Sequence, residues 1–195
     1  MTHEEYTRKG EIVDKIVNEE KINDLIRDLK SSNKYCKFDD SQLKEIALGF
    51  FNNVNTMVYE NEGYTHHQMR VIREGLEHNL DVTCYTSIKF DGFQMREIYD
   101  GLISGLDTKI YARPEFNSSQ MSLIRIGMNF GVDVSQYADP SYGLIKMTCI
   151  GNALYNKLDP TPLLVLEEDD FLFNIYDKML KSSGVEEPKN IFEIS

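Results

Sequence analysis

The hydrophobic and polar positions of the chain recur with a period of 26 residues. Each copy opens with an aromatic residue, and a large apolar residue and an isoleucine follow five and eight positions later. The first four copies also carry a glutamine four positions and a glycine eleven positions after the aromatic residue. The opening residues of the five copies are Phe38, Tyr64, Phe90, Phe116 and Tyr142. A period of this length predicts supersecondary units that stack and bury their apolar faces together.

Each copy is predicted to form one helix of about 13 residues followed by a second, very short helix. In four copies the residue after the opening aromatic is a good N-cap, and the glutamine three positions further on completes a capping box. These N-cap residues are Asp39, Thr65, Asp91 and Asn117. An aspartate is expected to cap the short helix in the same way. The aspartates are Asp81, Asp107, Asp133 and Asp159.

A glycine recurs in the middle of the first helix in four copies, as Gly49, Gly75, Gly101 and Gly127. Glycine in a helix interior costs about 1 kcal/mol relative to alanine, so its repetition indicates a packing constraint. We expect neighbouring helices to approach backbone to backbone at this position, where a Cβ would push them apart.

The segments on both sides of the repeats are predicted to be helical caps. Residues 11–30 change their apolar face at the polar stretch 18–21, which suggests two helices rather than one. Residues 171–180 form an amphipathic helix that begins after an acidic run, where the helix dipole favours negative charge. The last stretch, residues 185–195, is either a loose tail or a docked strap.

These elements predict an all-α fold, a solenoid of about five 26-residue αα-hairpin repeats with helical caps. The N-terminal helical cap spans residues 1–37, the array residues 38–158, and the C-terminal capping helix and tail residues 159–195. The fifth copy departs from the pattern, with Lys146 in place of the glutamine and Ala153 in place of the glycine, as is common in terminal repeats.

The repeat resembles a short helical repeat found in proteins of Firmicutes and of their phages and mobile elements. The shared pattern reads F-[DNT]-x-x-Q-M-x-x-I-x-x-G-L-x-x-G-L-D-V-x-x-Y-A-x-P, and residues 116–140 match it best. The resemblance covers residues 38–158. It carries over no catalytic residues and implies no enzymatic activity. It implies a context in which small accessory proteins bind host machinery, immune nucleases included.

The composition excludes several classes of protein. Hydrophobic residues make up 41% of the 195 residues, enough to bury a core. No apolar run approaches the roughly 20 residues of a membrane helix, and the N-terminus lacks the apolar stretch of a signal peptide. Three cysteines without a Cys-x-x-Cys pair favour a reducing compartment over a disulfide framework, so we expect a cytoplasmic protein.

The net charge of −11 falls entirely on the array and the C-terminal cap. Residues 1–37 hold eight acidic and eight basic residues, residues 38–141 hold 15 and eight, and residues 142–195 hold nine and five. One interpretation is a polyanion mimic that occupies the nucleic-acid channel of a basic protein. The other is a solvated surface that keeps the chain soluble.

No motif in the sequence indicates catalysis, a cofactor or a metal. The chain lacks a glycine-rich phosphate loop, a G-x-S-x-G elbow and an H-E-x-x-H helix. The recurring methionines lie on the apolar face predicted for the core, and the recurring aspartates lack the ligand density of a calcium site. We therefore expect no enzyme, no cofactor and no metal, with an enzyme that uses an unrecognised site as an alternative.

Candidate partner-binding residues lie at helix positions that vary between the repeats. Five basic residues line one side of the predicted helices and form a basic ridge: Lys44, Arg70, Arg73, Arg96 and Arg125. The ridge either grips phosphates or an acidic partner, or it pairs with carboxylates such as Glu45, Glu74 and Glu97. The apolar candidates at variable positions are Phe51, Tyr99, Ile103 and Tyr155.

We therefore predict a non-enzymatic protein-binding module. The resemblance suggests an accessory protein of a phage or mobile element that inhibits or regulates a host protein, such as an immune nuclease of the CRISPR type. The acidic array favours a basic protein partner. The alternative is a nucleic-acid-binding repeat protein that uses the basic ridge, and no membrane partner is expected.

Overall fold

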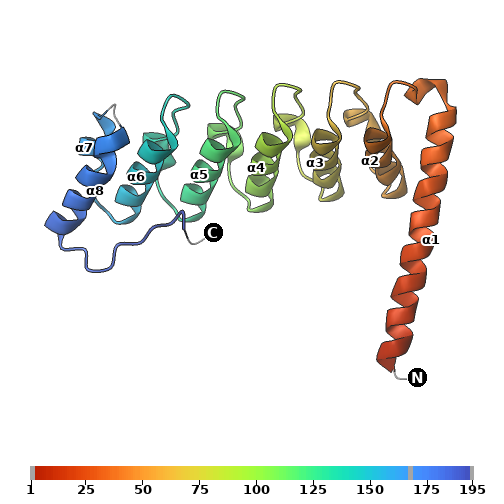
Figure 1. Cartoon of the computed structure of the whole chain (residues 1–195), viewed down its shortest axis with the longest axis horizontal. Helices are drawn as coiled ribbons and strands as arrows, with labels where there is room; N and C mark the ends of the chain where they lie inside the picture. Colours follow the sequence, from red (N-terminus) through yellow and green to blue (C-terminus); the bar gives the residue numbers. More distant parts are fainter. Residues whose placement is uncertain (1–2, 167–168, 194–195) are drawn as a thin grey trace. The chain divides into compact units, whose positions relative to one another are not determined.

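The computed structural model describes residues 3–166 and 169–193, and all regular elements in these ranges are helices (Figure 1). The α-helices are α1 (His3–Ser31), α2 (Asp40–Phe51), α3 (His66–Glu77), α4 (Gly92–Ile103), α5 (Ser118–Asn129), α6 (Leu144–Tyr155), α7 (Thr161–Leu164) and α8 (Asp169–Ser183). The single 3₁₀ turns are η1 (Asn33–Tyr35), η2 (Thr56–Val58), η3 (Val82–Cys84), η4 (Thr108–Ile110) and η5 (Val134–Gln136). The prediction of an all-α solenoid of helical repeats is confirmed, and a 3₁₀ turn is the second helix in the first four hairpins.

The chain forms two compact units, Met1–Ile88 and Lys89–Ser195. In the first unit α1 packs against α2, and α2 packs against α3. In the second unit α4 packs against α5, α5 against α6, and α6 against both α7 and α8. The recurring isoleucines and methionines of the repeats are completely buried in this packing, as expected for the core. Each unit thus buries apolar faces that no single repeat could bury by itself.

The predicted capping boxes are present at the start of α2, α3, α4 and α5. In α5 the Gln120 amide donates to Asn117 at 2.9 Å, and the Asn117 amide donates to Gln120 Oε1 at 2.9 Å. The same glutamine donates through Nε2 to the carbonyl oxygens of Pro140 and Tyr142, at 3.0 and 2.8 Å, in the loop before α6. The glutamine therefore caps the N-terminus of its own helix and also binds the loop of the next repeat. The sequence pattern did not reveal this second role.

The fifth repeat replaces this glutamine by Lys146 and keeps the link to the segment that follows. α6 begins after Gly143, which provides no side-chain cap. The Lys146 Nζ atom instead donates to the carbonyl oxygens of Leu164 and Leu166, at 3.0 and 2.8 Å. An ammonium group is well placed there because the carbonyl end of a helix carries partial negative charge.

The recurring helix glycine has a different cause from the predicted one. The tyrosine that follows each 3₁₀ turn folds back onto the helix of its own repeat, and its hydroxyl lies where a glycine Cβ would be. In the fourth repeat the Tyr137 hydroxyl donates to the Leu123 carbonyl at 3.3 Å, in the space beside Gly127. The same bond within other repeats is made by Tyr59, Tyr85 and Tyr111. The prediction of backbone contact between neighbouring helices was wrong, because a side chain of the same repeat fills this position.

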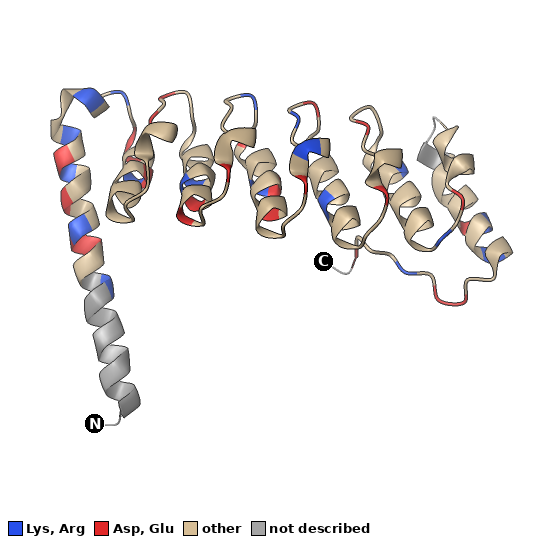
Figure 2. Ribbon diagram, turned by 180° about the vertical axis from the view of Figure 1, so that it is seen from behind, with Lys and Arg blue, Asp and Glu red and all other residues tan. Residues whose placement is uncertain are grey.

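At the N-terminal end α1 is one continuous helix, so the prediction of two helices in residues 11–30 was wrong. The stretch 18–21 contains neither glycine nor proline, and the apolar face therefore turns without a break in the helix. With 29 residues α1 is about 44 Å long, against about 18 Å for the 12 residues of α2. The N-terminal part of α1 extends beyond α2, and acidic and basic positions alternate along the part of α1 that is coloured in Figure 2.

At the C-terminal end α7 begins after Pro160, so the expected N-cap role of Asp159 was wrong. Asp159 still accepts from the amide and the hydroxyl of Thr161, at 3.0 and 2.6 Å. The aspartates predicted for the other short helices do cap η3, η4 and η5. After α8, Gly184 has a φ of +72°, and residues 185–193 return to α6. Residues 185–193 are therefore a docked strap, and residues 194–195 of the predicted tail lie outside the described residues.

Candidate interaction surface

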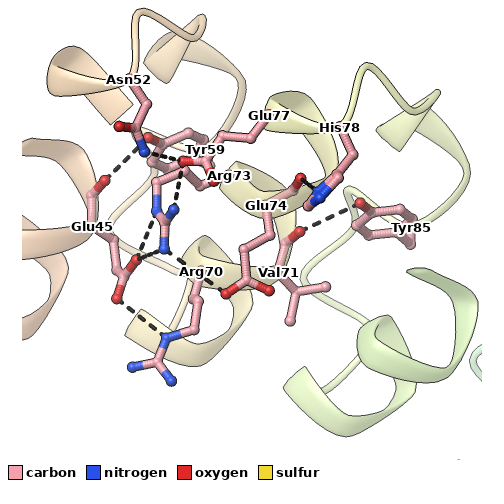
Figure 3. A network of polar contacts seen from close by, with 10 residues as sticks. All are labelled: Glu45, Asn52, Tyr59, Arg70, Val71, Arg73, Glu74, Glu77, His78 and Tyr85. Atoms are coloured by element: carbon pink, nitrogen blue, oxygen red, sulfur yellow. Dashed lines mark hydrogen bonds and ion pairs between the residues drawn. The ribbon is translucent and has the colours of Figure 1, made fainter. Parts of the chain in front are cut away.

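The basic ridge predicted from the sequence includes a buried network of ion pairs in the first unit (Figure 3). Arg73 on α3 is 8% exposed, and its Nε and Nη2 atoms lie 3.0 and 2.9 Å from one carboxylate oxygen of Glu45 on α2. Its Nη1 atom contacts Glu77 one turn further along α3, and Asn52 donates to the same Glu77 oxygen at 2.6 Å. Arg70 Nε reaches the other oxygen of Glu45 at 3.4 Å. These side chains therefore join two repeats.

The surroundings of Arg73 keep its guanidinium charged. Burial by itself would lower the pKa of Arg73, but the contacts with Glu77 and Glu45 outweigh this effect and raise the pKa. Burial also raises the pKa of Tyr59, whose hydroxyl donates to the main-chain carbonyl of Glu45 at 3.2 Å. Removal of one partner from a buried ion pair costs about 3–5 kcal/mol, because the other charge is left uncompensated. The packing of α2 against α3 is therefore sensitive to the loss of either charge.

The second unit contains the same ion pair two repeats later. Arg125 Nε on α5 lies 2.8 Å from Glu97 on α4, and both pairs are separated by 28 residues in the chain. Repeats 1 and 3 hold the glutamate, whereas repeats 2 and 4 hold the arginine and have Val71 or Leu123 at the glutamate position. The first four repeats therefore alternate between glutamate and arginine at these positions, whereas the fifth repeat has Cys149 and Gly151 there.

The rest of the basic ridge is divided between exposed and packed side chains. Lys44 is exposed, and the Arg96 guanidinium lies over the Tyr99 ring at 4.7 Å from its centroid. Arg70, Arg73 and Arg125 lie within ion-pair distance of carboxylates. The described side chains thus show pairing with carboxylates at three of the five ridge residues, and the use of the ridge by a partner stays a prediction.

The predicted apolar candidates also separate into buried and exposed side chains. Tyr99 is buried and Phe51 is half-buried. Ile103, the last residue of α4, is 50% exposed, and Tyr155, the last residue of α6, is half-buried. Phe130, directly after α5, is 38% exposed, and its ring meets that of Tyr155 edge-on with the centroids 5.6 Å apart. We refer to Ile103, Phe130 and Tyr155 at the ends of these three helices as the apolar edge.

Phe130 was not predicted as a candidate, although the repeat pattern contains a signal for it. Phe130 is the residue directly after the fourth repeat helix. The corresponding residues of the other repeats are Asn52, His78, Ser104 and Asn156, all of them polar. Exposed aromatic side chains are enriched in protein interfaces, so an aromatic residue at an otherwise polar position indicates a contact surface.

Two asparagines one turn apart, Asn152 on α6 and Asn156 at its C-cap, hold the C-terminal strap, and we refer to them as the clasp. Asn156 Oδ1 accepts from the Lys189 amide at 3.0 Å, and its Nδ2 donates to the Lys189 carbonyl at 2.9 Å. Asn152, which is 4% exposed, accepts from the Ile191 amide at 3.1 Å and donates to Asn190 Oδ1 at 3.0 Å. The clasp was not predicted. The helix α6 belongs to the fifth repeat, which departs from the repeat pattern at several positions, so the two asparagines did not stand out from its other departures.

Two hollows lie beside these features. One of about 360 Å³ is bounded by Tyr155, Asn156 and Lys157 of the last repeat and by Glu187 and Lys189 of the strap. It therefore touches both the apolar edge and the clasp. A larger, polar hollow of about 600 Å³ lies at the carboxyl ends of α2 and α3. Its lining residues are Asn52, Asn53, Val54, Asn55, Leu76, Glu77 and Asn79.

Among the residues that the structure describes, no three His, Cys, Asp or Glu side chains are grouped so that they could hold a metal ion. Within the same described ranges, no helix is both long enough and apolar enough to cross a membrane. Comparison of the chain with protein-family models, with curated proteins and with solved structures finds no match.

Proposed function

We propose that the chain is a non-enzymatic protein-binding module that docks on a partner protein through its apolar edge. The observation that supports this function is the exposure of Ile103 and Phe130, large apolar side chains at the ends of two adjacent repeat helices. A few such anchors contribute most of the affinity in protein interfaces. They project from packed helices of one unit, so little conformational freedom is lost when a partner binds.

The acidity of the chain supports a partner with a basic surface. Residues 89–195, which include the apolar edge, hold 16 acidic and 10 basic residues, for a net charge of −6. Complementary charge speeds the encounter of two proteins and selects between partners, more than it adds affinity. We therefore assign affinity to the apolar edge and partner selection to the net negative charge of the unit that carries it.

The partner that we propose is a host protein that the chain inhibits or regulates, such as an immune nuclease of the CRISPR type. The support is the resemblance of the repeat to those of phage and mobile-element proteins, together with an acidic surface that suits a basic nucleic-acid channel. DNA cleavage by purified nucleases of this type, measured with and without the chain, is the test. Cleavage rates that stay constant at a saturating excess of the chain would remove the nuclease as the partner.

Capture of partners from host extract tests the docking surface. The chain is immobilised, and bound proteins are identified by mass spectrometry. Ile103→Asp combined with Phe130→Asp should abolish capture of the specific partner, because two carboxylates would lose their hydration in the interface. Phe93→Asp is the matched control, since Phe93 is 77% exposed in the first turn of α4, outside the apolar edge. This control should capture the same partner as the wild-type chain.

Equal capture by the wild-type chain, the double variant and the control would contradict the assignment of the apolar edge. Retention of nucleic acid in place of protein, with binding that weakens steeply as salt is added, would contradict the function itself. Lys44→Glu then identifies the surface used, because Lys44 is an exposed member of the basic ridge.

A further inference from the structure

The clasp on α6 recognises the main chain of the strap. Asn156 binds both the amide and the carbonyl group of Lys189, as the edge of a neighbouring β-strand would. Asn152 binds the amide of Ile191, two residues further on, and the side chain of Asn190. The bound strap forms a turn here, because the Glu193 amide donates to the Asn190 carbonyl at 3.4 Å and the Phe192 amide donates to Asn190 Oδ1 at 3.1 Å. The clasp is therefore chemically suited to segments of other chains that make the same turn.

Two strap side chains fill apolar positions beside the clasp. Ile191 is completely buried, and the Phe192 ring packs against Gly151 of α6. An added Cβ at Gly151 would lie 2.7 Å from the ring Cζ atom, so the ring occupies space that a side chain would fill. The corresponding residues of the other repeats are Ala47, Arg73, Tyr99 and Arg125. Room for the ring is therefore particular to α6, and the site selects an aliphatic residue followed by an aromatic one.

An exposed tether connects the strap to the rest of the unit. It starts at Gly184, and residues 186–189 are exposed, so release of the strap breaks mainly the clasp hydrogen bonds and the packing of Ile191 and Phe192. An empty clasp, by contrast, would leave the buried amide of Asn152 without its present partners, which is unfavourable. Replacement of the strap by another segment is therefore more favourable than release of the strap to leave the clasp empty.

We propose that the clasp is a peptide-recognition site, which the strap occupies in cis and which a segment of the partner protein that makes the same turn, with an aliphatic residue followed by an aromatic one, occupies in trans. This inference rests on the proposed function, because it takes the partner to be a protein. The hollow between Tyr155, Asn156 and the strap connects the clasp to the apolar edge. One partner can therefore insert its segment into the clasp and cover the apolar edge with its folded surface.

Binding of a separate peptide to a vacated clasp tests the site in the full chain. Ile191→Ser with Phe192→Ser keeps the clasp and removes the side chains that fill it. A fluorescein-labelled peptide of residues 185–193 should bind this variant one to one, as measured by fluorescence anisotropy. The wild-type chain should bind the peptide at least about tenfold more weakly than this variant does. Its own strap competes for the clasp, because the tether holds the strap at an effective concentration on the order of millimolar. Adding Asn156→Ala should abolish binding, whereas adding Asn174→Ala, at an exposed position on α8, should not.

A vacated variant that keeps the helical circular dichroism of the wild type but does not bind the peptide would overturn the proposal. Binding that survives Asn156→Ala would overturn it as well. Should the double substitution unfold the chain, hydrogen exchange of the wild type decides instead. The amides of Lys189 and Ile191 should then exchange much faster than that of Ile150 in the core of α6. Equal protection of these amides would show that the strap is a permanent part of the fold.

Light scattering distinguishes a partner's segment from the strap of a second copy. The wild-type chain should have the monomer mass of 22.6 kDa at all concentrations. A dimer that Phe192→Ser abolishes would overturn the assignment to another protein. The capture assay with the apolar-edge variants fails or succeeds independently of peptide binding, so the proposed function and the peptide site are tested separately.

Discussion

Replacement of Gly127 by alanine is expected to destabilise the chain, although alanine is the better helix former by about 1 kcal/mol. The added Cβ would overlap the hydroxyl oxygen of Tyr137 and would lie 3.2 Å from its Cζ atom and 3.0 Å from Cγ1 of Val134. Tyr137 is completely buried, so it can move only by displacing its neighbours. It would also lose its hydrogen bond to the Leu123 carbonyl.

These effects give the size of the expected loss. The lost hydrogen bond costs about 1 kcal/mol, and overpacking around a buried side chain costs about 1–3 kcal/mol. Against these stands the gain of about 1 kcal/mol in helix propensity. Gly127→Ala should therefore lower the free energy of unfolding by about 1–3 kcal/mol, which corresponds to a decrease in Tm of about 2–12 °C for a chain of this length.

A double-mutant cycle, measured by urea unfolding with circular dichroism, isolates the clash. Tyr137→Phe alone should cost about 1 kcal/mol, because it removes one buried hydrogen bond. In the double variant the oxygen that the Cβ would overlap is absent. The combined loss should therefore be smaller than the sum of the single losses by about 1–2 kcal/mol.

Gly131→Ala is the matched control for this cycle. Gly131 has a φ of +71°, and among the described residues no atom lies within 4 Å of an added Cβ. Alanine should cost about 1–2 kcal/mol there through backbone strain alone, and Tyr137→Phe should not change that cost. Additive losses for Gly127→Ala and Tyr137→Phe would refute the conclusion that the tyrosine hydroxyl requires the glycine.

Three further substitutions test the links between neighbouring segments. Glu45→Leu should lower the free energy of unfolding by about 3–5 kcal/mol, because it removes a partner of buried Arg73, and adding Arg73→Leu should restore most of that loss in thermal unfolding. Gln120→Ala should cost about 1–3 kcal/mol and speed hydrogen exchange at the start of α6, because two carbonyls of the next repeat lose their donor. Burial would raise the pKa of Glu60, but hydrogen bonds, chiefly from Lys34, outweigh this effect and lower the pKa. The ionised carboxylate therefore stabilises the fold above about pH 4.5, and this stabilisation is lost as the pH falls through the lowered pKa. In urea unfolding, the difference in free energy of unfolding between the wild type and Glu60→Gln should thus be constant near neutral pH and decrease in acid. An increase of this difference in acid would contradict the lowered pKa of Glu60.

The sequence was sufficient to predict features that depend on neighbours within one repeat. The capping box of Asn117 and Gln120 spans three residues, and its geometry follows from the helix itself. The buried isoleucines and methionines follow from the helical spacing of the apolar positions in the same way. Repetition reinforced both predictions, because each copy is an independent observation of the same local rule.

Features that depend on how the chain returns to itself could not be predicted. The pattern showed that Gly127 and Tyr137 recur together, but the contact between them requires the path of the 3₁₀ turn. Pairing of the ridge arginines with glutamates was one of two open interpretations, and only the stacking of the helices identifies Glu45 as the partner of Arg73 across 28 residues. Asn152 binds the strap 39 residues further along the chain. Because the strap lies outside the repeats, no sequence pattern indicated this contact.

The alternation of glutamate and arginine between repeats limits how such an array can change its length. Loss of the second repeat alone would bring Tyr99 to the place where Arg73 now meets Glu45, and a buried carboxylate would remain without a counter-charge. Loss of the second and third repeats together would instead bring Arg125 opposite Glu45 and restore a matched pair. Arrays of this kind should therefore gain and lose repeats two at a time. The surface available to a partner would then grow or shrink by two neighbouring repeats, one with the glutamate and one with the arginine.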